Sequence, residues 1–309
     1  MIAIYKNTET GLKTLDEPIG GAWINVIDPS PQEINQLQQL GIPSDYFTYP
    51  LDLDERARIE RENGELLIVV RIPEFQGVSA DVPYLTVPLG IILTEKYIFT
   101  VCKHESIILQ DFASGRAKAL STSKRQRFLL RLLHDIAAKY LTYLREINKV
   151  VDVLEDQLQL STRNKEVLEL LKYQKSLTYF TTALKANELM MERLQRSQMF
   201  KKYPEDEDLL DDVLIENRQA IEMTNIASNI LSSMMDAFAS IISNNLNAVM
   251  KFLASVTIVL SLPTMIASFY GMNVPLPMQE NPTSFLIILA LSLAISLSVM
   301  YIFIKRDWF

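Results

Sequence analysis

Residues 252–273 read FLASVTIVLSLPTMIASFYGMN, an apolar run without a charged side chain that ends in Gly-Met-Asn. After a short polar loop, a second apolar run, SFLIILALSLAISLSVMYIFI, occupies 284–304. Each run is about as long as a helix needs to cross a hydrocarbon core of roughly 30 Å. The sequence therefore predicts a C-terminal hairpin of two transmembrane helices, at 252–270 and 284–304.

The residues that flank the two runs predict how the hairpin is oriented. Lys251 precedes the first run and Lys305-Arg306 follow the second, so both basic flanks lie on the same side of the membrane. Basic residues concentrate on the cytoplasmic side. We therefore expect both termini, including the tail 305–309, in the cytoplasm, the loop 271–283 outside, and the protein in the cell membrane.

The first 115 residues have the pattern of a cytoplasmic α/β domain. Ser30-Pro31-Gln32-Glu33 carries the capping-box signature of a helix start. Thr94-Glu95-Lys96 lies between two apolar runs and predicts a hairpin turn, so part of the sheet is expected to be antiparallel. Runs rich in Ile, Val and aromatic residues favour strands at 2–6, 22–27, 66–72, 84–93 and 97–102.

Long helices are expected between this domain and the hairpin. Residues 116–203 contain neither glycine nor proline, and their apolar residues recur at helical spacing, which predicts antiparallel helices with a turn at Ser161–Asn164. Residues 205–262 again lack both helix breakers. They predict a stalk helix, 204–251, that continues without interruption into the first span.

Composition excludes several classes of function. The 309 residues carry a net charge of −7, and a nucleic-acid partner would require a basic surface. No glycine loop for phosphate and no nucleophile beside a histidine is recognisable, so we expect neither an enzyme nor an organic substrate. The single cysteine, Cys102, lies in an apolar run and is expected to be a buried, reduced thiol. Both histidines, His104 and His134, lie outside the spans.

One face of the first span is small or polar, while the rest of that helix is aliphatic or aromatic. Small residues often mark tight helix packing in membranes, and a water-lined pore predicts the same stripe. The stripe continues into the stalk through Asn229, Ser233, Asp236, Ser240 and Ser243, where packing inside a bilayer gives no reason for it. This extension favours a pore. The stripe within and next to the span consists of Asn247, Met250, Ala254, Thr257, Ser261, Thr264 and Ser268.

A single helix cannot enclose a pore, so this interpretation requires a homo-oligomer with the first spans at its centre. The second span has no comparable stripe, because its Ser292, Ser296 and Ser298 appear scattered. We therefore expect the second span on the outside, against lipid.

Gly271-Met272-Asn273, at the end of the first of two C-terminal spans, resembles the signature of the CorA family of magnesium channels. Residues 247–251 and 263–270 are also similar to that family. The resemblance implies a homopentameric funnel, with an α/β domain, long helices and the hairpin, that conducts Mg²⁺. Gly271, Met272 and Asn273 would form a ring at the outer mouth, where Asn273 accepts hydrogen bonds from the hydration shell and Gly271 permits a tight turn.

The same resemblance implies roles in the pore. Asn247 and Met250 match positions that line the inner pore, and Met250 with Leu253 or Ala254 would form an apolar constriction that closes by dewetting. Asp236 lies eleven residues before Asn247, about three helical turns, and therefore on the same face. Copies of Asp236 would form an anionic ring that concentrates cations.

Acidic residues outside the pore are implied to bind or attract cations. Asp212 matches the stalk-side acid of a regulatory Mg²⁺ site between subunits, with Asp52, Asp54 or Glu55 as candidate partners. Glu280 would attract cations outside. The outer loop departs from the family's usual Met-Pro-Glu-Leu, which leaves only Glu280 for this role, and the tail 305–309 is poorer in lysine than in many members.

Two alternatives stay open at the level of sequence. A transporter of the same superfamily for Zn²⁺, or for Co²⁺ or Ni²⁺, would share this layout, although softer metals favour His or Cys along the path. The resemblance also implies magnesium, because zinc-transporting relatives usually alter the middle residue of the triplet, which here is Met272. A membrane-anchored helical scaffold would explain the long helices and the hairpin. It would not explain the polar stripe or the Gly-Met-Asn triplet.

Overall fold

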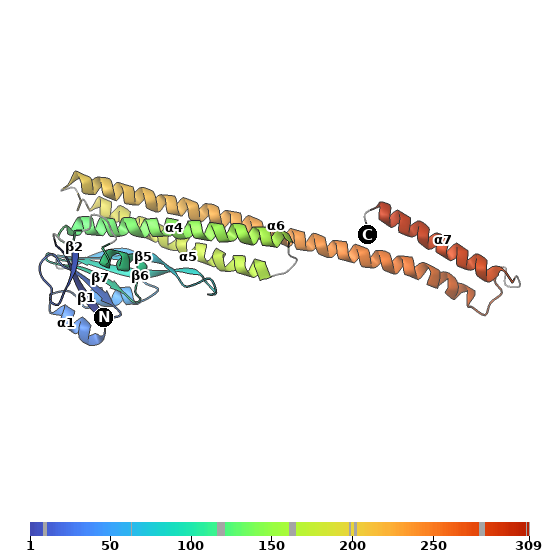
Figure 1. Cartoon of the computed structure of the whole chain (residues 1–309), viewed down its shortest axis with the longest axis horizontal. Helices are drawn as coiled ribbons and strands as arrows, with labels where there is room; N and C mark the ends of the chain where they lie inside the picture. The colour runs from blue at the N-terminus through green and yellow to red at the C-terminus, as the bar shows by residue number, and fades with distance from the viewer. Residues whose placement is uncertain are drawn as a thin grey trace. The chain divides into compact units, whose positions relative to one another are not determined.

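The computed structural model describes residues 1–8, 11–62, 64–115, 121–160, 165–197, 199–200, 203–277, 282–306 and 308. The chain divides into two compact units, Met1–Met234 and Met235–Phe309. The first unit contains a β-sheet and long helices, and the second contains the apolar hairpin (Figure 1).

The first unit is built on a mixed sheet, whose strands in the described residues follow the order β2-β1-β3-β7-β6-β5-β4. Neighbouring strands pair antiparallel, except β3 and β7, which are parallel. The strands are β1 (Ile2–Thr8), β2 (Gly11–Leu15), β3 (Trp23–Ile27), β4 (Arg58–Glu62), β5 (Glu65–Phe75), β6 (Tyr84–Leu93) and β7 (Ile98–Cys102).

The structure confirms every strand expected from the sequence and adds β2 and β4. Each of these two pairs with a single described neighbour, β2 with β1 and β4 with β5. An edge strand can keep polar side chains, because it is not buried on all sides. The sequence of β4, Arg-Ile-Glu-Arg-Glu, therefore lacks the apolar run by which the buried strands were recognised.

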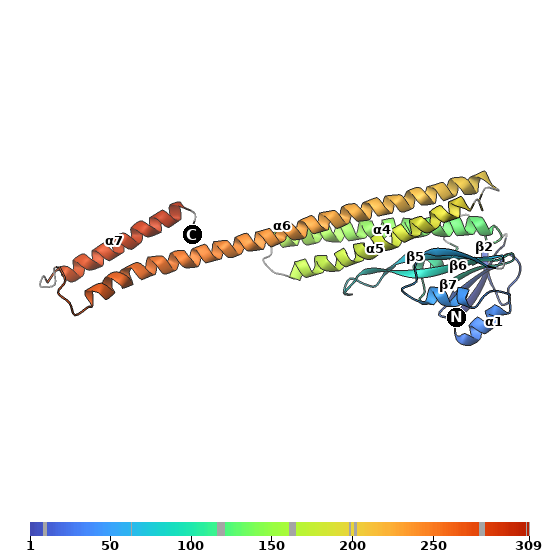
Figure 2. The ribbon, with the colours of Figure 1, turned by 180° about the vertical axis from the view of Figure 1, so that it is seen from behind.

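Helices cover both faces of the sheet (Figures 1 and 2). On one face, α1 (Pro31–Gln38), α2 (Asp45–Thr48) and the short 3₁₀ helix η1 (Tyr49–Leu51) complete a core in which Leu37 and Phe47 contact strand residues. The capping box is confirmed, since Ser30 Oγ accepts from the Glu33 N–H and Glu33 Oε2 accepts from the Ser30 N–H.

On the other face lie α3 (Ile107–Ala113), α4 (Arg125–Leu160) and α5 (Lys165–Arg196). Buried Trp23 contacts Phe112 of α3 and Phe128 of α4, with ring centroids 6.3 and 5.4 Å apart. The predicted pair of long helices is confirmed, and the turn expected at residues 161–164 lies outside the described residues.

The third long helix, α6 (Pro204–Tyr270), has 67 residues and belongs to both units. In the first unit it packs on α5, where Asn217 Nδ2 donates to Leu184 O at 3.1 Å and Gln174 Nε2 donates to Ser228 Oγ at 3.0 Å. In the second unit it is followed by α7 (Ser284–Lys305). Both α6 and α7 contain segments long and apolar enough to cross a membrane. α6 is uninterrupted from Pro204 to Tyr270, and α7 contains the second apolar run of the sequence. The boundaries of the stalk and of the membrane spans stay predictions.

Burial makes Cys102 a poor nucleophile. Its side chain is 1% exposed on β7, and burial raises the pKa of its thiol to about 12. An ordinary cysteine has a pKa of about 8.5, so at pH 8 the thiolate fraction should be about 10³-fold lower than in an exposed cysteine. Labelling by a chromogenic disulfide should accordingly be about 10³-fold slower in the native protein than after denaturation, and should accelerate about tenfold from pH 8 to pH 9. Equal native and denatured rates would contradict this account.

Candidate functional site

The polar stripe expected from the sequence lies along α6 and is uncovered within one chain. All of its members are exposed, and so is Asp236 farther up the same helix. Met250 is 60% exposed, although it is a large apolar residue. The exposed stripe consists of Asp236, Asn247, Met250, Ala254, Thr257, Ser261, Thr264 and Ser268.

The opposite face of α6 in the second unit is the one that α7 covers. Ser255 is fully buried, while Val259, Leu262 and Ile266 are partly buried. These positions lie about half a helical turn from the stripe, because α-helical residues advance by 3.6 per turn. Ser296 of α7 donates to Val259 O at 3.4 Å, which fixes the side on which the two helices meet.

One sequence interpretation is corrected here. Ser292 and Ser296 are not scattered, because they are 5% and 7% exposed and form a small buried face of α7. Their spacing of four residues was the available signal, since residues four apart lie on the same side of a helix. Ser298, two residues further on, is exposed.

The threonine hydroxyl groups of the stripe donate their hydrogens to backbone carbonyls of their own helix. Thr257 Oγ1 donates to Leu253 O at 2.7 Å, and Thr264 Oγ1 donates to Leu260 O at 3.1 Å. A hydroxyl that gives its proton to the backbone keeps its lone pairs available as acceptors. Water around a cation points its hydrogens outward. The stripe therefore presents acceptors that suit a hydrated cation.

The Gly-Met-Asn triplet forms an exposed turn after α6. The Gly271 N–H donates to Ala267 O at 2.9 Å and the Met272 N–H donates to Phe269 O at 3.3 Å. The Asn273 side chain is exposed and makes no hydrogen bond within the described part of the chain. Its amide is thus available to an external partner, whereas Glu280 lies outside the described residues.

Gly271 does not have the backbone conformation that a tight turn was expected to require. It is absent from the glycines with a positive φ, and a Cβ built on it would lie 3.5 Å from the carbonyl oxygens of Ala267 and Ser268. Both distances are ordinary contacts. A single chain therefore has no steric need for glycine at this position.

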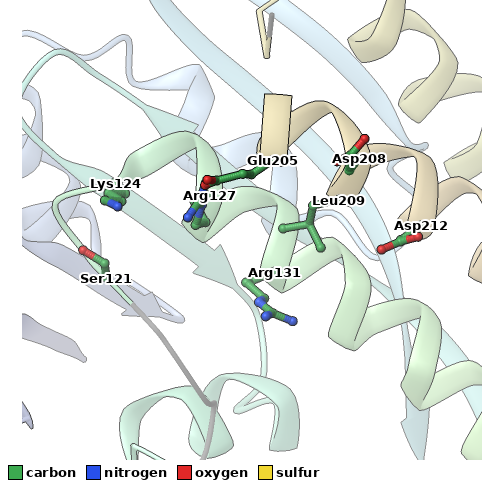
Figure 3. Close-up of a pocket in the computed structure, with 8 residues that line it drawn as sticks. All are labelled: Ser121, Lys124, Arg127, Arg131, Glu205, Asp208, Leu209 and Asp212. Atoms are coloured by element: carbon green, nitrogen blue, oxygen red, sulfur yellow. The ribbon is translucent and has the colours of Figure 1, made fainter. Parts of the chain in front are cut away.

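Asp212 lines a hollow of about 580 Å³ between the starts of α4 and α6 (Figure 3). The hollow is lined by three cations and three acids. Arg127 bonds to both Glu205 and Asp206 at 2.7 Å and holds the pKa of the Glu205 carboxyl below its ordinary value. Its lining residues are Ser121, Lys124, Arg127, Arg131, Glu205, Asp208, Leu209 and Asp212.

The proposed partners of Asp212 lie in a different place. The Arg71 guanidinium donates to Leu53 O at 2.6 Å and to Glu55 O at 3.0 Å, and so holds the loop that carries Asp52, Asp54 and Glu55. None of these acids lines the hollow around Asp212. Among the described residues, no three His, Cys, Asp or Glu side chains are grouped to hold a metal. A regulatory metal site between subunits stays a prediction.

The comparisons with known proteins agree with the layout. The family model described as CorA-like Mg²⁺ transporter protein matches residues 20–306. The cobalt/magnesium transport protein CorA of Methanocaldococcus jannaschii is 31% identical over 298 residues, which cover 93% of this chain and 90% of that protein.

Solved structures give the same result. The complete structure of the CorA magnesium transporter from Methanocaldococcus jannaschii matches with a TM-score of 0.86 at 25% identity, covering 100% of this chain and 99% of that one. The full-length CmaX protein matches with a TM-score of 0.71 at 14% identity, covering 97% of each chain, and so shares the fold.

The family model over residues 20–306 and the 31% identical relative place the chain among the membrane transporters and channels for divalent cations. This chain belongs to the CorA-like Mg²⁺ transporter family. Members of this family are transporters and channels, not enzymes.

Proposed function

We propose that this chain assembles as a homopentamer in the cell membrane, with the first spans around a central axis, and conducts Mg²⁺ into the cell. The observation that carries the proposal is the division of α6 into two faces. α7 covers the face of Ser255 and Val259, while the stripe from Asn247 to Ser268 is left exposed. A homo-oligomer with the first spans at its centre would direct that stripe toward a shared, wet axis, and the continuation of the stripe into the stalk favours this over tight helix packing.

The chemistry of the stripe suits a cation that keeps its water. Mg²⁺ loses its hydration shell reluctantly, so a pore that coordinated it directly would have to offset the cost of removing that shell. The first span offers hydroxyl acceptors instead, Asn247 and Asn273 add amides just before and just after it, and α6 from Phe252 to Tyr270 has no charged residue. A ring of Asn273 side chains would accept from the water shell at the outer mouth.

The cytoplasmic end of the stripe would both attract cations and close the pore. Copies of Asp236 would concentrate cations on the cytoplasmic side of the pore. Met250, together with Leu253 or Ala254, would form the apolar constriction that closes by dewetting. When internal Mg²⁺ is high, a site that includes Asp212 and an acid from residues 52–55 of the neighbouring subunit would hold the channel shut.

The proposal is tested by reconstituting the purified full chain in liposomes that contain a Mg²⁺-sensitive dye. We expect Mg²⁺ influx that follows the imposed gradient, and a mass in detergent corresponding to five chains. Zn²⁺ influx that requires a pH gradient, without Mg²⁺ influx, would favour the zinc alternative. A monomer or dimer that transports neither ion would favour the alternative of a membrane-anchored helical scaffold.

A further inference from the structure

The pore-lining helix contains a backbone acceptor that its own helix cannot satisfy. Pro263 lies inside α6 and has no N–H group. In an α-helix the N–H of residue 263 would donate to the carbonyl of Val259, four residues earlier. Val259 O therefore lacks its normal partner. Inside a bilayer no bulk water can replace that donor, and an unsatisfied carbonyl there is strongly unfavourable.

The missing donor comes from the other span. Ser296 of α7 is 7% exposed, and its Oγ donates to Val259 O at 3.4 Å. The neighbouring hydroxyls behave differently, because each donates to a carbonyl of its own helix at 2.7–3.1 Å. They belong to Ser255, Thr257, Ser261, Thr264, Ser292 and Ser298.

We infer that Ser296 is a positioning residue for the ion pathway. Its hydroxyl replaces the N–H that Pro263 lacks, and it thereby fixes the rotation of α6 about its own axis. The bonded carbonyl of Val259 lies on the face opposite the stripe, which includes Ser261 and Thr264. A helix held by α7 at Val259 must direct the stripe away from α7. The inference rests on the proposed function, because only that function places the pore axis on the side of α6 that faces away from α7.

Removal of the hydroxyl should lower ion flux by disturbing that rotation. Without Ser296, Val259 O would have to accept from the waters of the proposed pore, which would lie on the other side of α6. Turning the carbonyl toward them turns the stripe away from the axis. Hydrogen bonds between transmembrane helices have modest strength, so we expect Ser296→Ala to reduce Mg²⁺ influx per oligomer by about threefold.

The proline supplies a test that a purely structural role would not pass. In Pro263→Ala, residue 263 regains its N–H and can donate to Val259 O within the helix. Ser296→Ala should then have little effect when it is added to Pro263→Ala, although it lowers flux in the natural background. Ser296→Thr keeps a hydroxyl and should restore the natural flux.

Ser292→Ala is the matched control, because Ser292 is as buried as Ser296 but donates to Leu289 O on its own helix. All variants are compared as reconstituted full-length oligomers of verified mass. The inference is overturned if Ser296→Ala conducts like the natural protein, if its effect persists undiminished beside Pro263→Ala, or if Ser292→Ala has the same effect.

The Tm of each of these variants is also measured by thermal unfolding of the oligomer in detergent, a measurement that does not depend on transport. Ser296→Ala should lower the Tm by about 2 °C in the natural background and by much less beside Pro263→Ala. If the natural protein carried no ion but this pattern of Tm values appeared, the proposed function would fail while the bond itself stood. If no pattern appeared in either measurement, Ser296 would have no such role.

Discussion

Replacing Asn273 with alanine is expected to reduce Mg²⁺ influx by more than about tenfold, while the oligomer still assembles. The side chain is exposed and makes no hydrogen bond in the described part of its own chain, so its loss removes no support from the fold. Each copy in the assembly would lose one amide acceptor for the hydration shell. Because every copy carries the change, the losses add around the ring.

The measurement is initial Mg²⁺ influx into liposomes, normalised to the amount of reconstituted oligomer. Asn245→Ala is the matched control, because Asn245 is also an exposed asparagine of α6 but lies on the side of the helix opposite Asn247. It should conduct normally. Influx by Asn273→Ala equal to that of Asn245→Ala would exclude a selective ring at this triplet.

The second large effect is expected on stability, from Asn187→Leu. Arg71 on β5 lies opposite Pro88 of β6 at a position where the two strands exchange no hydrogen bond, because bonded pairs alternate from the one in which the Gln76 N–H donates to Pro83 O. The Arg71 N–H and C=O therefore point away from β6, toward the side of β4, and β4 begins at Arg58 opposite Val69 and does not reach Arg71. Fully buried Asn187 of α5 bonds to both groups, since its Oδ1 accepts from the Arg71 N–H at 2.9 Å and its Nδ2 donates to Arg71 O at 2.8 Å. Tyr140 OH also donates to Arg71 O at 3.0 Å.

A leucine at position 187 would leave the Arg71 N–H buried without an acceptor and remove one of two donors from its carbonyl. We expect a loss of about 2–3 kcal/mol and a fall in Tm of roughly 5–10 °C for the full chain in detergent. Tyr140→Phe removes only one bond and should lower the Tm less, and Asn245→Ala should leave it unchanged. An unchanged Tm for Asn187→Leu would show that these bonds contribute nothing net.

Much of the candidate site could be predicted because it depends on one helix. The stripe from Asn247 to Ser268 follows from the helical repeat, and the structure leaves all of it exposed. Whether position 271 needs a glycine could not be predicted in the same way. A Cβ there meets only ordinary contacts in one chain, so any need for glycine has to come from neighbouring copies.

The surroundings of the acidic residues were beyond the reach of the sequence. Asp212 belongs to an acidic stretch, yet the structure places it in a hollow with Lys124, Arg127 and Arg131. These cations begin α4, some eighty residues earlier in the chain. Similarly, nothing in the sequence around Asp52 and Asp54 indicates that Arg71 holds their loop. Charge patterns along a chain do not show which charges meet.

The sequence alone determined the features that arise from neighbouring residues: the two spans from apolar length, the long helices from the absence of glycine and proline, and the start of α1 from its capping box. Only the tertiary structure decided how two gaps in the backbone hydrogen bonding are filled. Asn187 bonds to the Arg71 N–H and C=O beyond the end of β4, and Ser296 supplies the donor that Pro263 lacks. The physical reason is that each gap is local, whereas the side chain that fills it is distant in sequence and comes within hydrogen-bonding distance only after the helices pack.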